Sequence, residues 1–542
     1  MYEIIRELMA LQEREGWLPP EGLSALAARL RIPLHRLESV STFYTHFRRE
    51  PASGEEVAVC RDLSCRLAGS EGIREELTRR CAREGGASVR EVSCLGRCDR
   101  APAVALGHAL VDPLLGPQDP ASLEARLRAR DHAPDERPMR AWPAADPYAS
   151  EGEGLAPYAV IREALAGSQE AVVGRLDAAG LRGMGGAAFP TARKWSLVAA
   201  EPATPKYVIC NADESEPGTF KDRELLHDLP HLVIEGLLLA GFSVGATQGT
   251  IFIRHEYEPE RRRLEAAIAE AREQGALGRG IFGSDFDFDV EIFVSPGGYI
   301  LGEETALLEC LEGRRGEPRN KPPFPGQRGL FGQPTLINNV ETLVHSVAIA
   351  HRGPEWWAGL GRGDERGHKF LSVSGDVERP GVGLYAFGTP LREILEQHGG
   401  IEAGAELLAF APGGASSAFL PPDALDTPLG FEAIAAAGSM LGSGALVFIA
   451  EGRDLLEVGL AVTRFFRNES CGKCVPCRMG TEKAVSLVEK AGAISEADEV
   501  LLRSLAATMG QTSICGLGQV ALTPLVSILD RFSDRVRRVA GD

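Results

Sequence analysis

The chain has 542 residues, too many for one hydrophobic core, and its composition of 44% hydrophobic and 25% charged residues is ordinary for a globular protein. Its net charge of −18 argues against nucleic acid as the main partner, because neutralising phosphates requires a basic surface. No apolar run reaches membrane-spanning length and the charged N-terminus lacks a signal-peptide core, so we expect a cytoplasmic protein that a partner could still hold at a membrane.

The chain begins with a helical region, residues 1–54. In "LPPEGLSALAARL" two prolines mark a helix start, and Leu23, Leu26 and Leu30 fall along one helical face. Eleven cysteines in a reducing compartment do not form a disulfide framework. Eight of them fall into two spaced quartets, whereas Cys81, Cys210 and Cys310 are scattered and are interpreted as packed thiols.

The first quartet lies within residues 55–130. Cys60 and Cys65 form a C-x4-C pair after a strand-like run, and Cys94 and Cys98 form a C-x3-C pair after a second such run. The stretch between the pairs has helical periodicity, so the order predicts a compact βαβ-type unit with four thiolates at loop ends. A [2Fe–2S] cluster accepts this unequal spacing, which is awkward for zinc, and zinc is the alternative.

Residues 131–154 are rich in Pro, Ala and charge without periodicity, which predicts a linker. Residues 155–355 alternate helical and strand-like runs with glycine turns, as an α/β domain does. Within the following unit, 365–450, the stretch 368–400 reads as β-rich with one helix. From 454 to 542 short helical runs predict a bundle.

The α/β region contains glycine loops and loop-borne polar residues. In "GLRGMGGAAFPTARKW" the glycines Gly183, Gly185 and Gly186 permit close backbone approach to a phosphate, and Lys194 can supply counter-charge. The pattern is not a GxGxxG fingerprint, so a plain tight turn is the alternative. Amides and carboxylates in later loops suit the edges of a flavin or nicotinamide and sugar hydroxyls: Asn211, Asp213, Glu214, Glu216, Glu303, Glu304, Asn338 and Asn339.

The second quartet lies in the C-terminal bundle. "ESCGKCVPCRMG" sets Cys471, Cys474 and Cys477 at intervals of three, and Cys515 follows in "QTSICGLG". Three thiolates at such steps with a distant fourth favour a [4Fe–4S] cluster, and structural zinc is the alternative. Two clusters in one chain indicate electron transfer.

Taken together, these motifs resemble the NADH-oxidising flavoprotein subunit of respiratory complex I and its soluble relatives, the NAD-dependent molybdenum or tungsten formate dehydrogenases and NAD-reducing hydrogenases. The segments are "RGMGGAAFPTARKW", "NADESEPGTFKDRELL", "GGYILGEETALLECLEG", "KPPFPGQRGLFGQPTLINNVETL" and "ESCGKCVPCRMG…TSICGLG". The N-terminal part, with "STFYTHFRREP" and the first quartet, resembles the separate thioredoxin-like [2Fe–2S] subunit, so the chain looks like the two subunits fused.

The resemblance implies an α/β multidomain protein. Its parts are N-terminal helices with a thioredoxin-like [2Fe–2S] domain, a Rossmann-like FMN domain, a ubiquitin-like β-grasp domain and a C-terminal helical [4Fe–4S] bundle. The expected FMN residues are Gly183, Gly185, Gly186, Lys194, Asn211, Asp213, Glu214, Tyr299, Gly302, Glu303, Asn338, Asn339 and Thr342. The expected NAD(H) residues are Phe189, Glu216, Glu304, Lys321 and Phe324. Met184 stands where arginine is common, and Ala188 stands where glycine is common; alanine is tolerable there if φ is negative.

The resemblance also implies a mechanism. Hydride passes between the nicotinamide and FMN, single electrons pass to the [4Fe–4S] cluster, and the [2Fe–2S] cluster lies off the main line. Glu216 and Glu304, beside the nicotinamide, are the expected catalytic residues. The protein is expected to be the beta subunit of a soluble molybdenum or tungsten formate dehydrogenase, with a pterin- and cluster-bearing catalytic subunit as partner. The alternatives are complex I, an NAD-reducing hydrogenase, and a flavin-less relay or scaffold subunit.

Overall fold

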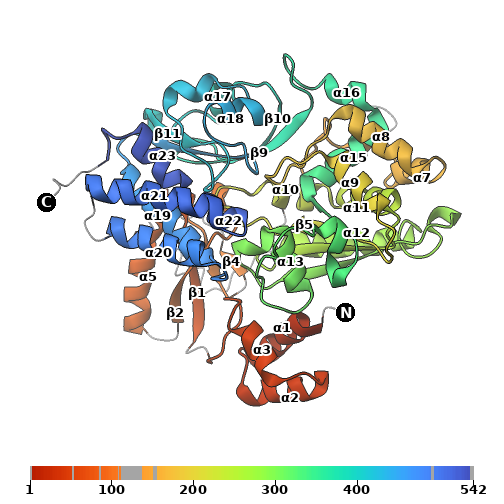
Figure 1. Cartoon of the computed structure of the whole chain (residues 1–542), viewed down its shortest axis with the longest axis horizontal. Coiled ribbons are helices and arrows are strands. Elements are labelled where there is room, and N and C mark those ends of the chain that lie inside the picture. Colours follow the sequence, from red (N-terminus) through yellow and green to blue (C-terminus); the bar gives the residue numbers. More distant parts are fainter. Residues whose placement is uncertain are drawn as a thin grey trace.

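The computed structural model describes residues 3–51, 54–84, 87–107, 109–111, 137–149, 155–489 and 493–536. Its strands form three four-stranded sheets in separate units, flanked by helical units at both ends of the chain (Figure 1). In this view the N-terminal helices lie at the bottom, the C-terminal helices at the left, and the central α/β unit at the right. The expected multidomain α/β architecture is confirmed.

The N-terminal unit consists of α1 (Glu3–Glu15), α2 (Pro20–Leu30) and α3 (Leu34–Ser41). Leu23 and Leu26 are buried in α2, as the helical period predicts, whereas Leu30 is partly exposed at its end. The unit docks on the central α/β domain, because Tyr44 donates from its hydroxyl to the carbonyl of Arg314 at 2.6 Å.

The cysteine-bearing unit has the predicted βαβ order. Its parallel strands β1 (Glu55–Cys60) and β2 (Ala87–Val92) are joined through α4 (Leu63–Leu67) and α5 (Ser70–Glu84). Two short strands, β3 (Val104–Leu106) and β4 (Ala109–Val111), complete the sheet in the order β2-β1-β3-β4. The remainder of the region predicted as 55–130, from 112 onward, lies outside the described residues.

The central domain is a parallel sheet in the order β7-β6-β5-β8. Its strands are β5 (Tyr207–Ala212), β6 (Gln248–Arg254), β7 (Asp289–Ser295) and β8 (Thr335–Asn339). β5 and β6 are almost wholly buried, as strands covered on both faces must be. The helices are α7 (Ala159–Leu165), α8 (Gln169–Ala179), α9 (Thr191–Ala200), α10 (Lys221–Asp228), α11 (Pro230–Val244), α12 (Glu258–Glu273), α13 (Glu304–Leu311), α14 (Pro325–Arg328), α15 (Val340–Arg352) and α16 (Pro354–Ala358).

The third sheet is mixed and runs in the order β10-β9-β12-β11. Its strands are β9 (His368–Gly375), β10 (Gly381–Ala386), β11 (Leu407–Ala411) and β12 (Ala445–Ala450), accompanied by α17 (Leu391–Gln397) and α18 (Phe431–Ala436). β9 and β12 are parallel, and both outer pairs are antiparallel. The single helix predicted within 368–400 is α17.

The C-terminal bundle contains α19 (Leu455–Glu469), α20 (Val475–Glu489), α21 (Glu496–Thr512), α22 (Gly516–Val520) and α23 (Thr523–Arg531). α19 and α23 pack closely, because a Cβ on Gly459 would stand 2.9 Å from Leu525 Cδ1. Buried side chains such as Phe465, Phe466 and Ile528 give the bundle an apolar core of its own.

The predicted linker differs from the structure where it is described. In residues 137–149, Trp142 is 6% exposed and donates from its indole N–H to Asp228 Oδ2 at 2.8 Å. Arg137 donates to Glu224 Oε1 at 2.6 Å. A buried indole and an ion pair anchor this segment on α10, so it is part of the fold. The lack of hydrophobic periodicity in its sequence indicates only that the segment is neither a helix nor a strand. The rest of 131–154 lies outside the described residues.

Among the described helices, no single one is long and apolar enough to cross a membrane. In the part of the chain that the structure describes, α10 and α11 together reach that length and composition, but they bend by 96° at their junction. Nearly all residues of α11 are buried inside the protein.

Candidate functional site

The candidate flavin site lies at the carboxyl ends of β5 and β8, which are neighbours in the sheet. Asn211 donates from Nδ2 to the carbonyl of Gly302 at 2.9 Å, so it fixes the loop after β7 to this edge. Asn339 caps α15 by accepting from the N–H of Glu341 at 3.0 Å, and donates to Asp222 Oδ2 at 2.6 Å. The amides singled out in the sequence therefore meet where an α/β sheet places its ligands.

Asn338 and Lys194 are held from the other side of the same edge. The indole N–H of Trp195 on α9 donates to Asn338 Oδ1 at 3.0 Å. The Lys194 ammonium, one residue earlier on α9, donates to the carbonyl of Ile337 at 2.7 Å. α9 thus places the Lys194 ammonium, the cation expected to face a phosphate, at the end of β8.

The glycine loop lies against this edge and leaves no room for side chains. A Cβ on Gly185 would stand 2.9 Å from Asn339 Cβ, and Gly186 has a φ of +122°, which side chains rarely adopt. The N–H of Met184 donates to Thr342 Oγ1 at 2.9 Å, which fixes the loop on α15. The backbone is therefore open to a close ligand, as the glycines predict.

Two residues depart from the family pattern in this loop. Ala188 has a φ of +52°, so the condition of a negative φ is not met, and alanine in this left-handed conformation costs roughly 1–2 kcal/mol. Met184 is buried, and its carbonyl accepts from the Lys369 ammonium at 3.0 Å. Lys369 lies on β9, so a buried cation from the mixed sheet stands beside the residue that replaces the usual arginine.

Asp213 supplies a direct test of whether the edge fits a flavin mononucleotide. Its Oδ1 accepts from Ser215 Oγ at 3.1 Å, whereas its Oδ2 is buried and has no hydrogen-bond partner in the described structure. Burial raises the pKa of Asp213 to about 7. An orphaned buried oxygen is costly unless a ligand group pairs with it. A hydroxyl-rich flavin tail beside side-chain-free glycines meets that need, so the residues fit FMN.

Glu214, one of the expected FMN residues, has protein partners for both of its carboxylate oxygens. Its two carboxylate oxygens accept from the backbone N–H groups of Asp222 at 2.8 Å and Arg223 at 3.0 Å. The hydroxyl of Tyr257 donates to it at 3.0 Å. Glu214 therefore binds the first turn of α10, where orphan N–H donors favour a carboxylate. It shapes the loop that holds Asp213.

The expected dinucleotide residues surround an open face. The Lys321 ammonium binds Glu303 Oε1 at 3.0 Å and Glu304 Oε1 at 3.1 Å. Glu303 also caps α13, where its Oε2 accepts from two backbone N–H groups. Phe189 and Phe324 are 41% and 55% exposed, which makes their rings available for stacking.

Glu216 connects the central domain with the mixed-sheet unit. Its Oε1 accepts from the N–H of Ser416 at 2.6 Å, and the hydroxyl of Tyr299 donates to the carboxylate. Burial raises the pKa of Glu216 to about 7. The expected flavin residue Tyr299 and the expected dinucleotide residue Glu216 are thus in direct contact.

The first cysteine quartet lies at the junction of its unit with the central domain. Its four thiols are 1–5% exposed. The Sγ atoms of Cys94 and Cys98 are 3.5 Å apart, and Cys60 has side-chain contacts with Cys65 and Cys94. The N–H of Gly218, in the loop after β5, donates to Cys98 Sγ at 3.3 Å. A ligand-bearing loop of the flavin domain thus reaches the sulfur atoms of this unit.

The second quartet lies between α19 and α22. Cys477 and Cys515 are 5% and 9% exposed, whereas Cys471 and Cys474 are partly exposed. Burial raises the pKa of Cys477 to about 12, and Cys474, Cys515 and Cys471 add to this rise, so the four thiols share one neighbourhood. A Cβ on Gly518 would stand 2.9 Å from Cys477 Cβ, which shows how closely the two segments approach.

No three or more His, Cys, Asp and Glu side chains within the described ranges are arranged to hold a single metal ion. We therefore propose the two ligand sets from loop position and proximity. The first is Cys60, Cys65, Cys94 and Cys98, and the second is Cys471, Cys474, Cys477 and Cys515.

Comparisons with known proteins agree with this geometry. Residues 176–348 match the family described as Nuo51 FMN-binding domain, 2–127 match Thioredoxin-like [2Fe-2S] ferredoxin, and 457–539 match NADH-ubiquinone oxidoreductase-F iron-sulfur binding region. An NADH-quinone oxidoreductase subunit of Rhizobium meliloti (strain 1021), the one designated F 2, is 43% identical over 379 residues, 69% of this chain and 90% of that protein. The chain belongs to this NADH-binding flavoprotein family.

Other family members come from a different type of complex. NADP-reducing hydrogenase subunit HndC of Solidesulfovibrio fructosivorans is 40% identical over 374 residues, 68% of this chain and 76% of that protein. A chain in the crystal structure of an NAD+-reducing [NiFe]-hydrogenase in the H2-reduced state matches with a TM-score of 0.85 at 31% identity. That match covers 97% of this chain and 91% of the other.

Membership in the flavoprotein family decides the cofactors. The protein binds FMN, NAD(H), a [2Fe–2S] cluster and a [4Fe–4S] cluster, and it is an NADH oxidoreductase module that transfers electrons. Zinc at either quartet and a flavin-less scaffold, the alternatives left open by the sequence, do not agree with these family matches.

Several residues at the flavoprotein site were not found from the sequence. Lys369, Arg223, Arg254 and Glu469 contact the cofactor-bearing loops from distant segments. The only sequence signal was their type, a charged residue next to an apolar run, and that signal is shared by many surface residues.

Proposed function

We propose that the chain exchanges hydride between NAD(H) and its FMN, and single electrons with its two iron–sulfur centres. FMN, when bound, supplies the conversion of two-electron into one-electron chemistry. The observation that supports this best is the sheet edge itself, where the buried Asp213 Oδ2 has no partner in the described structure and the N–H of Gly183 in the glycine loop donates to the carbonyl of Phe189 at 2.9 Å. The proposed FMN, NAD(H) and cluster ligands are the residues named for each group above.

The side chains of the open face bind and orient the dinucleotide in this proposal. The rings of Phe189 and Phe324 offer stacking surfaces for a base or nicotinamide. Lys321 and Lys194 balance the two carboxylates Glu303 and Glu304, so the face binds a phosphate-bearing ligand without a large excess of positive charge. A nearly balanced face binds and also releases its ligand, which suits turnover.

The second quartet lies close to this site. The charge of Glu303 and the thiol of Cys471 both contribute to raising the pKa of Cys515, which burial raises first, to about 11. Burial and Glu216 raise the pKa of Tyr299, and Cys515 adds to the rise. Tyr299 and Glu303, two of the proposed flavin residues, thus interact electrostatically with Cys515 of the second quartet.

Electrons leave through the exposed side of the bundle in this proposal. Cys471 and Cys474 are partly exposed, and Val475 and Met479 beside them on α20 are 58% and 57% exposed. These two side chains are one helical turn apart on the same face, and large exposed apolar side chains mark interaction sites. This surface fits a partner that brings its own cluster close to the [4Fe–4S] centre.

We propose a cluster-bearing catalytic subunit as this partner, in a cytoplasmic, soluble formate dehydrogenase that carries a molybdenum or tungsten pterin. Support comes from Met184 in the glycine loop, whereas the fusion of both modules in one chain fits a hydrogenase equally well. A hydrogenase is the second candidate, favoured by the match to an NAD+-reducing [NiFe]-hydrogenase over 97% of this chain. Complex I is the third, favoured by the 43% identical NADH-quinone oxidoreductase relative.

Purification of the tagged chain from its native cells tests the proposal. Co-purification of a pterin subunit with formate-dependent NAD+ reduction is the expected result. A nickel–iron subunit or membrane subunits would instead assign the chain to a hydrogenase or to complex I. Absence of flavin fluorescence after denaturation would overturn the diaphorase assignment itself.

Glu304→Gln should tighten dinucleotide binding. The variant removes one negative charge near the ligand phosphates while Lys321 remains, which strengthens NADH binding by ~1 kcal/mol, or about fivefold in Kd, for a partly screened group. Tighter ground-state binding slows product release, so both KM and kcat should fall. Dye reduction kinetics give KM and kcat, and the FMN content shows whether the flavin is retained. Loss of FMN with unchanged NADH affinity would place Glu304 on the flavin instead.

Met479→Asp should weaken partner binding without affecting dye reduction. A carboxylate buried without a partner in the interface costs about 1–3 kcal/mol, so affinity should fall about five- to 150-fold. Leu197→Asp is the matched control, because Leu197 is 56% exposed on α9, in the central domain rather than the bundle (Figure 1). Equal loss in both variants, measured by pull-down, would contradict the docking surface.

A further inference from the structure

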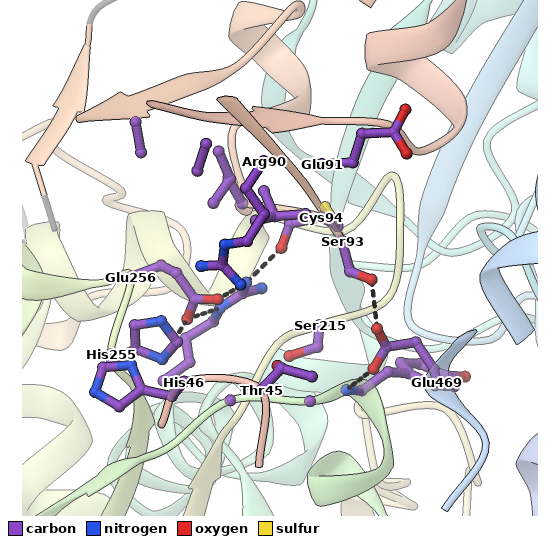
Figure 2. A pocket seen from close by; sticks show the side chains of 18 of the residues that line it. Thr45, His46, Arg90, Glu91, Ser93, Cys94, Ser215, His255, Glu256 and Glu469 are labelled. Atoms are coloured by element: carbon purple, nitrogen blue, oxygen red, sulfur yellow. Dashed lines mark hydrogen bonds and ion pairs between the residues drawn. The ribbon is translucent and has the colours of Figure 1, made fainter. Parts of the chain in front are cut away.

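One carboxylate joins the three cofactor-bearing parts of the molecule. Glu469 is the last residue of α19 and stands two positions before Cys471. It accepts a hydrogen bond from the hydroxyl of Ser93 at Oε1, and its Oε2 accepts from the backbone N–H of Tyr299 at 2.8 Å. Figure 2 shows Glu469 between the Ser93–Cys94 segment and the loop that follows β7.

Each of these partners lies next to a proposed cofactor ligand. Ser93 directly precedes Cys94 of the [2Fe–2S] set, and Tyr299 belongs to the flavin set. Glu469 itself directly precedes the first loop of the [4Fe–4S] set. A single side chain thus connects residues 93, 299 and 471, which come from three units of the fold.

The surroundings of Glu469 are hollow. A cavity of about 290 Å³ has Ser93, Cys94 and Glu469 on one side and His46 and His255 on the other (Figure 2), and Tyr299 also lines it. Close packing, which elsewhere fixes one unit against another, is missing on this side. Hydrogen bonds across the cavity wall must therefore hold the Ser93–Cys94 segment.

The [2Fe–2S] unit is also held at other points, so it does not depend on Glu469 to stay docked. Arg223 binds Asp99 with both guanidinium arms, at 2.9 and 2.8 Å, next to Cys98. Arg254 donates to the carbonyl of Cys94 and is itself held by an ion pair with Glu256 at 2.8 Å. Loss of Glu469 should therefore leave the chain folded while it frees one side of the Cys94 loop.

We propose that Glu469 is a positioning residue for the [2Fe–2S] centre. It fixes the Ser93–Cys94 segment against the loop that contains Tyr299, and its negative charge lowers the reduction potential of the centre. This inference rests on the proposed ligand set. The potential of a cluster depends on nearby charge and on hydrogen bonds around its sulfur atoms. When the centre is reduced it gains one electron and one negative charge, and a neighbouring carboxylate opposes that gain.

Three variants separate the charge of Glu469 from its positioning role. Glu469→Gln removes the charge, while its amide can still accept from Tyr299 and donate to the Ser93 hydroxyl. Glu469→Ala removes the charge and both hydrogen bonds. Ser93→Ala removes one hydrogen bond and no charge. Glu489→Gln is the matched control, because Glu489 pairs with Arg464 on the surface of the same bundle.

EPR-monitored redox titration of the full-length holoprotein and hydrogen exchange of the amides at 93–96 are the measurements. We expect a higher [2Fe–2S] potential in Glu469→Gln and Glu469→Ala, but little change in Ser93→Ala. Exchange at 93–96 should rise severalfold in Glu469→Ala and Ser93→Ala, and stay near wild type in Glu469→Gln. The double variant Ser93→Ala/Glu469→Ala should exchange no faster than Glu469→Ala alone, and the control should match wild type.

Unchanged potential and exchange in Glu469→Ala, with full iron content, would overturn the inference. A change confined to the [4Fe–4S] signal would also overturn it, since Glu469 would then serve only its own loop. If Glu469→Ala does not fold, hydrogen exchange in Ser93→Ala tests the positioning role, and wild-type exchange at 93–96 in that variant would overturn it. Wild-type protein without a [2Fe–2S] signal would instead refute the proposed ligand set, so the two failures are distinguishable.

Discussion

Replacing Cys474 with serine should remove the [4Fe–4S] centre and stop electron delivery to any partner, while NADH still reduces an artificial dye through the flavin. Serine is a poor ligand for iron in a cluster that is held by thiolates. Cys474 lies in the loop before α20, and it is not among the proposed flavin residues. Iron analysis, EPR and paired assays with a dye and with the native partner measure the effect.

The fold should survive this change. In the structure Phe465, Phe466, Leu525 and Ile528 are buried in the bundle, so α19 and α23 retain their packing without the cluster. Only the cysteine loop and α22 should loosen.

Cys81→Ser is the matched control for this prediction. Cys81 lies on α5 outside both quartets, so both iron–sulfur signals should persist in that variant. An unchanged iron count and EPR spectrum in Cys474→Ser would contradict the assignment of the second quartet.

The order of the elements could be predicted because its causes are local. The cysteine pairs follow strand-like runs with a helical stretch between them, and β1, α5 and β2 form accordingly. Asn211 and Asn339 could be placed together because both end buried strands, and parallel strands end at the same edge.

Contacts between distant segments could not be predicted in this way. Lys369 follows a glycine turn in the third unit, and only the packing of β9 on the central domain brings it to the carbonyl of Met184. Glu214 has the sequence setting of a ligand residue, yet the first turn of α10 binds both of its oxygens. Periodicity describes how one segment folds, whereas these roles depend on which units pack against each other.

Replacing Glu341 with leucine should destabilise the protein strongly. Glu341 is fully buried on α15, and its Oε2 lies 2.8 Å from the Lys221 ammonium and 3.0 Å from the Lys369 ammonium. Burial alone would raise the pKa of Glu341, but these two cations hold it well below its ordinary value. Removing the carboxylate leaves buried cations with too little compensation, which costs about 3–5 kcal/mol.

A second substitution should recover much of this loss. In Glu341→Leu/Lys369→Met one uncompensated cation is also removed, and Lys221 keeps its ion pair with Asp222 at 2.6 Å. Replacing buried charges by apolar groups of similar volume is often neutral. The recovered protein should nevertheless bind FMN more weakly, because the carbonyl of Met184 in the glycine loop loses the Lys369 ammonium.

Denaturant titration and FMN fluorescence separate these two effects. Glu341→Leu should lower the denaturation midpoint sharply, and the double variant should restore most of it while its Kd for FMN stays above that of the wild type. Lys369 is fully buried, so a stability loss below about 1 kcal/mol in Glu341→Leu would mean that water reaches the cations and that the network is not closed. Wild-type FMN affinity in the recovered double variant would show instead that Lys369 does not support the glycine loop.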